Sequence, residues 1–354
     1  MSNPVTITAA EAVCALGDNL QACLNAWQSG RSGLKLVEGR LQGQIADRTL
    51  MKGRRYGAAS NLAVHVARHA AQKAGWGAEA LRQSWLFAAS SRGNAGELLG
   101  RNGWRRPSTR FAASNTIHSE IAAAVSIELG IRGPWQMLSS GCSAGLDALG
   151  MAWMALQAGL TRRALVVAVD LPLIPELITA FQATHLLSTN GVNDPLSPET
   201  TGLHLGEAGV AVTLEVADEG LAGLTRYAAN SDAYDSLMIP EDGGPLAELL
   251  GSFSRPALIC PHATGTPNHA RAEMQAITTA FGAPPPPLLL MKPLTGHTLG
   301  ACGLLDTALL AGALTCPGPL PPLSKDDEIL KITSGMGGHN AAVALRVLNS
   351  CPAS

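Results

Sequence analysis

The sequence predicts an α/β fold made of two successive halves, in which helices cover both faces of each sheet. Short apolar segments recur along the chain, and residues 164–170 form an almost continuous apolar run. Runs of this kind are typical of strands that are buried on both faces. Segments with apolar residues at helical spacing alternate with them. This alternation predicts helix-sheet-helix layering, with one half over residues 1–217 and the other over residues 218–354.

The composition is that of a globular protein. Of 354 residues, 46% are hydrophobic and only 15% are charged, while 38 glycines indicate many tight turns. The net charge of −2 gives no whole-chain argument for binding nucleic acid or an anionic membrane surface. Any charged partner must therefore meet a local patch.

Cysteine usage and the N-terminal residues predict a protein of a reducing compartment. Seven cysteines are scattered from Cys14 to Cys351 without a CxxC pair, which argues against a disulfide framework and against a zinc site. The first residues lack a basic segment followed by an apolar core, and no apolar run approaches the ~20 residues that span a bilayer. We therefore expect a soluble, cytoplasmic protein.

Strand and helix signals follow one another along the chain. An apolar strand pattern opens it at residues 5–8, and residues 18–27 repeat apolar residues at helical spacing behind Asp18, a helix-capping residue. The other elements expected in the first half are helices at residues 55–75 and 115–129 and strands at residues 85–90, 164–170 and 209–216. In the second half, strands are expected at residues 257–260, 288–291 and 341–347.

Residues 138–149 place Cys142 in a turn of small residues before a long apolar run. A tight strand-to-helix turn needs neighbours without bulk, which Gly141, Ser143, Ala144 and Gly145 provide. A thiol at a helix N-terminus is expected to have a lowered pKa, and the thiolate is the form that attacks an acyl carbon. On this stretch alone, the alternative is a buried structural cysteine beside a helix start.

Two loops in the second half carry histidines. His262 lies within residues 260–267 and His297 within residues 292–303, and each loop is expected to follow an apolar strand. Glycine, alanine and threonine surround both histidines, which leaves room for a ligand backbone to approach. A lone histidine is more often structural, but two in such loops together with the cysteine turn favour a Cys-His-His site.

A basic stretch lies between residues 100 and 110. It gathers Arg101, Arg105, Arg106 and Arg110 around Trp104, with no compensating acid. Such a stretch is either a solvated surface loop or a docking site for an acidic partner.

With these motifs in this order, the chain resembles the β-ketoacyl-acyl carrier protein synthases (ketosynthases), the condensing enzymes of the thiolase-fold superfamily. Cys142 corresponds to the family's acylated cysteine. Residues 262–267 are similar to its His-Gly-Thr-x-Thr-Pro motif, and residues 292–301 to its Lys-Ser-x-x-Gly-His-x-x-Gly-Ala motif. The resemblance covers most of the chain. It implies a thiolase-like fold, in which two pseudo-duplicated α/β halves stack in an α-β-α-β-α arrangement.

The resemblance implies a two-stage reaction. An acyl group moves from a carrier thioester to Cys142, and a malonyl carrier then loses CO2 so that its carbanion attacks the acyl group. His262 and His297 would stabilise the enolate formed on decarboxylation. The backbone amides of Cys142 and Met336 would hold the thioester oxyanion.

The resemblance also implies supporting residues and partners. Lys292 would pair with Glu273 and fix the electrostatics around the histidines, while Thr264 and Thr266 would hydrogen-bond the phosphopantetheine arm. No metal or redox cofactor is expected, because an acyl carrier protein delivers the substrates on phosphopantetheine. The basic stretch at residues 100–110 is the candidate dock for that carrier. A homodimer, or a heterodimer with a second ketosynthase-like subunit, is expected to pair through residues 115–136.

Three positions depart from the family pattern. Ala270 stands where an aspartate is usual, Met336 replaces the phenylalanine of a Gly-Phe-Gly-Gly turn, and His339 replaces its threonine. A flexible methionine at the pocket tolerates other acyl shapes better than a planar ring. We therefore expect fatty acid, polyketide or polyene biosynthesis, with secondary metabolism favoured.

The competing hypothesis is a non-catalytic chain-length-factor subunit that shapes the pocket of a partner synthase. Such subunits resemble ketosynthases over their whole length but usually lack the nucleophile. Here the cysteine, both histidines and the lysine are all present. The intact set favours an active acyltransferase of the 3-oxoacyl-carrier synthase type.

Overall fold

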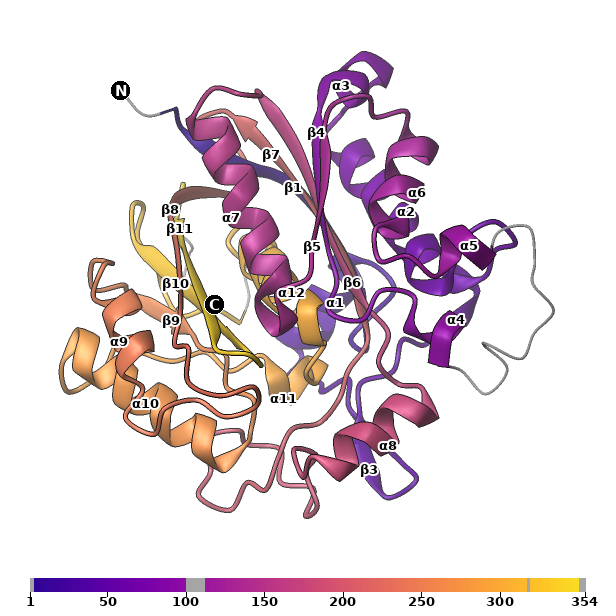
Figure 1. The fold of residues 1–354 in the computed structure, drawn as a ribbon. Helices are drawn as coiled ribbons and strands as arrows, with labels where there is room; N and C mark the ends of the chain where they lie inside the picture. The colour runs from indigo at the N-terminus through magenta and orange to yellow at the C-terminus, as the bar shows by residue number, and fades with distance from the viewer. Residues whose placement is uncertain (1–2, 100–111, 317–318, 350–354) are drawn as a thin grey trace.

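The computed structural model describes residues 3–99, 112–316 and 319–349, and its first half forms one portion of a sheet (Figure 1). The strand order there is β5 (Trp135–Leu138), β4 (Trp85–Ala89), β6 (Arg163–Asp170), β7 (Ala208–Val216) and β1 (Val5–Cys14). β4 runs parallel to β5 and β6, whereas β7 runs antiparallel to β6 and β1. Every residue of β6 after Arg163 is buried, as expected of a strand covered on both faces.

The second half contributes the other portion of the sheet. Its order continues with β8 (Ala222–Ser231), β11 (His339–Arg346), β10 (Glu328–Gly335) and β9 (Leu258–Cys260). β1 and β8 pair only through the first three residues of each strand. The predicted junction at residues 217 and 218 falls in the turn between β7 and β8. The division into two homologous halves stays a prediction.

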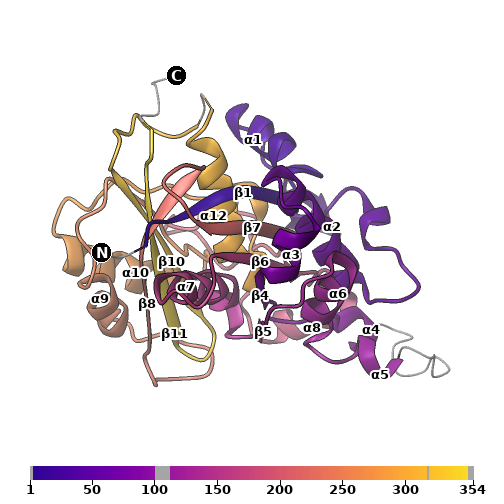
Figure 2. The same cartoon turned by 90° about the horizontal axis from the view of Figure 1, so that it is seen from above.

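Two central helices lie between the two portions of the sheet (Figures 1 and 2). α7 (Ala144–Gln157) contacts β4 and β6 of the first portion and β8 and β11 of the second. α12 (Cys302–Ala313) contacts β1, β7 and β10, and each of its residues is buried. A helix that is apolar on all sides belongs inside a protein. These two helices form the middle layer.

Outer helices cover the remaining faces. α2 (Ala58–Lys73) packs on β1, β6 and β7, and α6 (Glu120–Leu129) packs on β4 and β5. On the opposite side, α9 (Gly244–Leu250) contacts β8, β11 and α10 (Pro267–Phe281). Separate hydrophobic clusters fill the space beneath each outer layer and around the central helices. The layer order is the predicted α-β-α-β-α arrangement, which is thereby confirmed.

The other elements are short connections around this frame. The helices among them are α1 (Leu20–Gln28), α3 (Ala78–Gln83), α4 (Ala95–Leu99), α5 (Ala112–Asn115), α8 (Pro175–Ala183) and α11 (Lys292–Thr295). A hairpin is formed by β2 (Lys35–Val37) and β3 (Arg40–Gln42). Single 3₁₀ turns occur at Arg48–Met51, Gly141–Ser143 and Leu299–Ala301.

Some predicted elements are wrong in type or bounds. Residues 288–291 form no strand; Leu288 makes only an isolated bridge to Ile259, because the prolines at 284–287 and 293 remove backbone donors. The helix expected over residues 115–129 begins later, because α5 ends at Asn115 and α6 begins only at Glu120. Asn19 caps α1 instead of Asp18, since its side chain accepts a hydrogen bond from the Ala22 amide.

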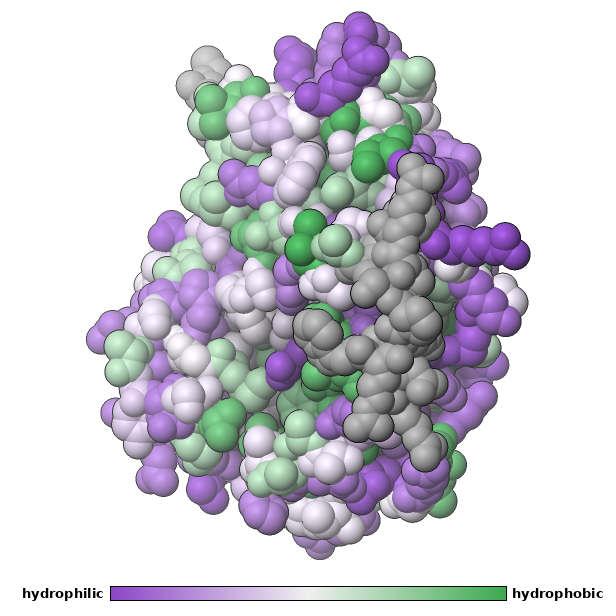
Figure 3. Space-filling model, turned by 45° about the vertical axis from the view of Figure 1, so that its right-hand side comes forward, coloured by the Kyte–Doolittle hydropathy of each residue, from purple (hydrophilic) through white to green (hydrophobic). Residues whose placement is uncertain are grey.

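The surface is mixed in character. On the face shown in Figure 3, hydrophobic side chains occur in small groups between hydrophilic ones. Within residues 3–99, 112–316 and 319–349, none of the helices combines the length and the apolar character that a membrane crossing requires.

Candidate active site

Cys142 lies in a sharp strand-to-helix turn. β5 ends at Leu138, the 3₁₀ turn Gly141–Ser143 follows, and α7 begins at Ala144. Gly141 has φ +61°, a left-handed conformation that favours glycine. A Cβ at this position would lie 3.3 Å from the carbonyl oxygen of Met336, so the turn is pressed against the loop that carries Met336. The small residues of the sequence motif are therefore explained by close packing.

The environment of the Cys142 thiol differs from the one expected from sequence. Burial, assisted by the neighbouring Cys302 thiol, raises the pKa of Cys142 to about 12, although a hydrogen bond from the Met336 backbone acts in the opposite direction. The predicted lowering of this pKa at the helix N-terminus is wrong, because the side chain is only 5% exposed and loses its hydration. Cys142 is thus a thiol at neutral pH and needs a proton acceptor when it attacks.

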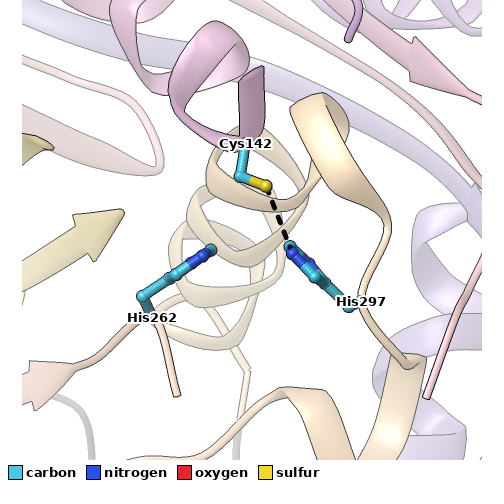
Figure 4. Close-up of side chains that lie close together, drawn as sticks. All are labelled: Cys142, His262 and His297. Atoms are coloured by element: carbon cyan, nitrogen blue, oxygen red, sulfur yellow. Dashed lines mark hydrogen bonds between the residues drawn. The ribbon is translucent and has the colours of Figure 1, made fainter. Parts of the chain in front are cut away.

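The structure brings both predicted histidines to this thiol, as Figure 4 shows. His297 Nε2 lies 3.3 Å from Cys142 Sγ. The rings of His262 and His297 lie 5.1 Å apart between centroids, at 81°. His262 follows β9 directly, whereas His297 follows α11 and the left-handed Gly296. One thiol and two imidazoles from distant segments thus share one site.

Both imidazoles are neutral at physiological pH. Burial lowers the pKa of His262 and that of His297 well below the usual value, with further lowering by His297 and by Lys292 respectively. Among the described residues, both His262 nitrogens and His297 Nδ1 have no hydrogen-bond partner. Neutral imidazoles with unpartnered nitrogens are suited to donate to a substrate oxygen.

Lys292 does not pair with Glu273 as predicted. Its Nζ lies 3.1 Å from Asp306 Oδ2, and the same oxygen lies 2.6 Å from Lys331 Nζ. Glu273 instead accepts backbone hydrogen bonds from His262 at 2.6 Å and Ala263 at 2.8 Å, which fixes the first histidine loop. Asp306 therefore binds the two lysines, and Glu273 fixes the backbone of the loop that carries His262.

Sequence reasoning missed Asp306 and Lys331. Asp306 is the single charged residue of α12, and Lys331 is fully buried in β10. Burial alone would raise the pKa of Asp306, but the Lys292 and Lys331 ammonium groups lower it. An isolated charge within an apolar segment is the signal that would have found both residues.

A cavity of about 260 Å³ opens beside the cysteine and the two histidines. Thr264 and Thr266 lie in its wall, as does Met336. Its apolar lining includes Phe181, Leu186, Leu203, Leu237, Met238, Ile239 and Leu299. Such a lining suits an apolar chain, and the predicted contacts of the threonines with phosphopantetheine stay a prediction.

A third histidine, His269, also lines this cavity, and sequence reasoning missed it. Its ring lies 5.2 Å from that of His262. Its position one helical turn before Glu273 was the available signal. By contrast, the arginines at 101, 105, 106 and 110 lie outside the described residues.

The loop that carries Met336 is fastened to the cysteine turn through His339. His339 Nε2 lies 3.0 and 3.1 Å from the two carboxylate oxygens of Asp147, in the first turn of α7. The Ser143 hydroxyl also donates to the His339 carbonyl oxygen at 3.0 Å. The side-chain hydrogen bond to Asp147 raises the pKa of His339. This pair joins the Met336 amide to the helix that follows Cys142.

The Asp147–His339 pair predicts a pH-dependent stability. Because the folded-state pKa of His339 is raised, its contribution is complete below the unfolded value of 6.5 and is lost as pH rises through the folded value. The ring is partly exposed, so the contribution is about 1 kcal/mol or less. Urea unfolding of wild type and His339→Gln should show a difference that is constant below pH 6.5 and shrinks as the pH rises above that value.

His204 provides the matched control for this measurement. Within the part of the chain that the structure describes, its Nε2 contacts the carbonyl oxygen of Val192 and no carboxylate. His204→Gln should not reproduce the pH slope. A pH-independent difference for His339→Gln would contradict the assignment.

A buried thiol in a strand-to-helix turn, faced by two neutral imidazoles within a layered two-sheet fold, is the arrangement that the resemblance to the β-ketoacyl synthases implied. Residues 50–219 match the beta-ketoacyl synthase N-terminal domain, and residues 256–322 match the beta-ketoacyl synthase C-terminal domain. The chain belongs to the beta-ketoacyl synthase family.

Curated relatives include polyketide synthases. The chain is 32% identical over 238 residues to the highly reducing polyketide synthase alnA of Emericella nidulans, which covers 62% of this chain and 10% of that protein. It is 29% identical over 279 residues to the actinorhodin polyketide putative beta-ketoacyl synthase 1 of Streptomyces coelicolor, with 65% and 58% covered. A putative polyketide beta-ketoacyl synthase 1 of Streptomyces cyaneus is 26% identical over 295 residues, 70% of each chain. The chain thus spans a tenth of the first relative and more than half of the others.

Solved ketosynthase structures have the same fold. A type II polyketide acyl-carrier protein in complex with its ketosynthase contains a chain with a TM-score of 0.86 at 22% identity, covering 98% of this chain and 100% of that one. The ishigamide ketosynthase/chain length factor gives 0.87 at 19% identity, with the same coverage. These likenesses confirm the predicted thiolase-like fold.

Proposed function

We propose that this protein is a β-ketoacyl-acyl carrier protein synthase that condenses a Cys142-bound acyl group with a malonyl unit, in the synthesis of a polyketide or related chain. The observation that carries the proposal is the Cys142–His297 contact of 3.3 Å with His262 beside it, at the wall of a largely apolar cavity. The similarity to polyketide ketosynthases supports this class of product.

In the first stage, the Cys142 thiol attacks the acyl thioester. His297 Nε2 is placed to accept the thiol proton, which the leaving carrier thiol takes up afterwards. The Cys142 and Met336 amides would hold the oxyanion of the tetrahedral intermediate, and a hydrogen bond from the Met336 backbone already reaches Cys142. The acyl chain would occupy the apolar part of the cavity.

In the second stage, the malonyl carrier enters and its bond between methylene and carboxyl carbons breaks. The electron pair moves into an enolate whose oxygen receives hydrogen bonds from His262 and His297. The enolate carbon then forms a bond to the acyl carbon, and the Cys142 thiolate leaves and takes up a proton. Both imidazoles act without carrying charge, since burial keeps them neutral.

The chain-length-factor hypothesis is less well supported. A pocket-shaping subunit needs no nucleophile, yet here the thiol lies 3.3 Å from His297 Nε2 and the His262 ring lies beside that of His297. The Cys142 sulfur and one ring nitrogen of each of the two histidines lie within 4.8 Å of one another, and we assign these three groups to acyl transfer. The expectations of a cytoplasmic protein without a metal or redox cofactor stay predictions.

An acyl carrier protein and a second ketosynthase-like chain are the proposed partners. β5 is the edge strand of the described sheet, with β4 as its one neighbour, and its first residue, Trp135, is 40% exposed. An exposed edge strand that begins with tryptophan is suited to pairing with another subunit. The structure complexed with a carrier and the one named ketosynthase/chain length factor support these two classes of partner.

The proposal is tested by giving the purified protein acyl-carrier and malonyl-carrier proteins together. We expect a mass increase on Cys142 from the acyl carrier, followed by CO2 release and a chain extended by two carbons on the malonyl carrier. Intact-protein mass spectrometry of both proteins measures these steps. If the chain acquires no acyl group while a partner subunit does, the chain-length-factor hypothesis is correct instead.

A further inference from the structure

His269 is a polar side chain of the cavity wall to which the proposed mechanism gives no task. It lies in the first turn of α10 and is only 7% exposed. Among the described residues, neither of its ring nitrogens has a hydrogen-bond partner. A buried imidazole that faces a cavity without a partner loses hydration and gains nothing in return, unless a ligand supplies the missing group.

Ring contacts link the three histidines of this wall in a series, which we call the row. His262 lies edge to face with His297 at 5.1 Å and with His269 at 5.2 Å. Beyond His269, the Glu273 carboxylate lies 3.6 Å from Nδ1. The row therefore begins at the Cys142 thiol and ends at a buried carboxylate.

The malonyl unit has two groups that fit this row. Its thioester carbonyl oxygen meets His262 and His297 in the proposed mechanism, and its carboxylate is joined to that carbonyl through a single methylene carbon. The carboxylate must therefore lie close to the carbonyl, within the spacing of neighbouring rings in the row. His269 is the next ring along.

We propose that His269 binds the carboxylate of the malonyl unit and is thereby a specificity-determining residue for the second substrate. This inference rests on the proposed function. With malonate bound, the imidazole takes up a proton from solvent, so that its cation lies between two carboxylates, with Nδ1 facing Glu273 and Nε2 donating to the ligand. His269 thus recognises the group that distinguishes an extender unit from a simple acyl thioester.

Charges near His269 are consistent with this assignment. The described residues that line the cavity include no lysine or arginine, so an imidazole is the side chain there that can supply a positive charge to the anion. Lys292, whose charge lowers the pKa of His269, is not among the lining residues and is held by Asp306. As CO2 leaves, the negative charge moves from the carboxylate to the enolate oxygen, away from His269 and toward the other two rings. His269 therefore stabilises bound substrate more than the transition state and lowers KM.

The experiment measures binding in Cys142→Ala protein, which cannot be acylated. Amide analogues of malonyl-pantetheine and acetyl-pantetheine, with nitrogen in place of the thioester sulfur, are titrated by calorimetry. We expect the malonyl analogue to bind about tenfold more tightly than the acetyl analogue, as for a charge-assisted hydrogen bond. Adding His269→Leu should abolish this preference and leave the affinity for the acetyl analogue unchanged.

Asn268→Ala in the same background is the matched control, because Asn268 lines the same wall and carries no charge. It should keep the preference for malonyl. A preference that survives His269→Leu, or that is absent from the Cys142→Ala parent, overturns the inference. If His269→Leu also weakens acetyl binding, His269→Gln is measured instead, since it keeps a polar side chain but cannot become a cation. Loss of the preference for malonyl in His269→Gln supports the inference, and a retained preference overturns it. Because no acyl-enzyme is involved, failure of the wild type to condense would count against the proposed function and not against this binding result.

Discussion

Cys142→Ala should abolish the acyl-enzyme completely, whereas His262→Ala should still be acylated and fail in condensation. The thiol is the attacking group, and no other described cysteine lines the cavity. Among the described residues His262 forms no hydrogen bond with the thiol, and its ring lies 5.1 Å from that of His297, beside the place where the enolate oxygen would lie. Losing one donor to a developing oxyanion costs ~10²- to 10³-fold in rate. Intact mass after acyl-carrier treatment, and product formation after adding malonyl carrier, measure the two stages separately.

His297→Ala should impair both stages. Its Nε2 contacts Cys142 Sγ, and a thiol whose pKa is about 12 needs a proton acceptor. We expect slow but detectable acylation and condensation reduced as strongly as in His262→Ala. His69→Ala is the control, because His69 lies on α2 outside the cavity lining. If His262→Ala prevents acylation as completely as Cys142→Ala does, the division of tasks between the two histidines is wrong.

The sequence identified the residues that carry chemistry because short motifs surround them. Cys142 needs small neighbours to form its turn, and the structure shows the close approach of Met336 that requires them. His262 and His297 stand in loops rich in glycine and threonine. Their meeting follows from the topology, which places α7 between both portions of the sheet. The sequence motifs therefore predicted the site, because the layered fold brings these separate motifs together in space.

The sequence could not predict how burial changes these groups. Burial raises the pKa of the Cys142 thiol, and this outweighs the lowering expected at a helix N-terminus. How deeply Cys142 is buried depends on the assembled fold. The prediction that Lys292 pairs with Glu273 was wrong for a similar reason. Motif spacing placed Glu273 in the site, but only packing shows that its oxygens are occupied by backbone amides. Asp306 lies in α12 and Lys331 in β10, and no sequence motif shows which face of α12 lies against β10.

Asp306→Asn is the second substitution with a large expected effect, and it acts on stability. Asp306 is 1% exposed and faces two buried ammonium groups, Lys292 and Lys331. Removing its charge leaves both cations in the interior without a counter-charge. Breaking a buried pair in this way costs about 3 to 5 kcal/mol in the free energy of unfolding. Urea denaturation at neutral pH measures the loss.

Lys331→Met is the matched control for Asp306→Asn. Methionine keeps the length of the side chain, and Asp306 then retains a single partner in Lys292, so the charges balance. Its loss of stability should be clearly smaller. An equal loss would mean that packing of the Lys331 stem, and not the shared carboxylate, stabilises this layer.

The pH dependence of Asp306→Asn gives an independent check. The two ammonium groups hold the folded-state pKa of Asp306 below its ordinary value of 3.8, so its contribution is complete above that value and is lost as pH falls through the folded value. The difference in unfolding free energy between wild type and Asp306→Asn should therefore be constant near neutrality and shrink in acid below pH 3.8. A difference that stays constant into acid would show that the carboxylate charge is not what holds the two lysines beneath the active-site histidines.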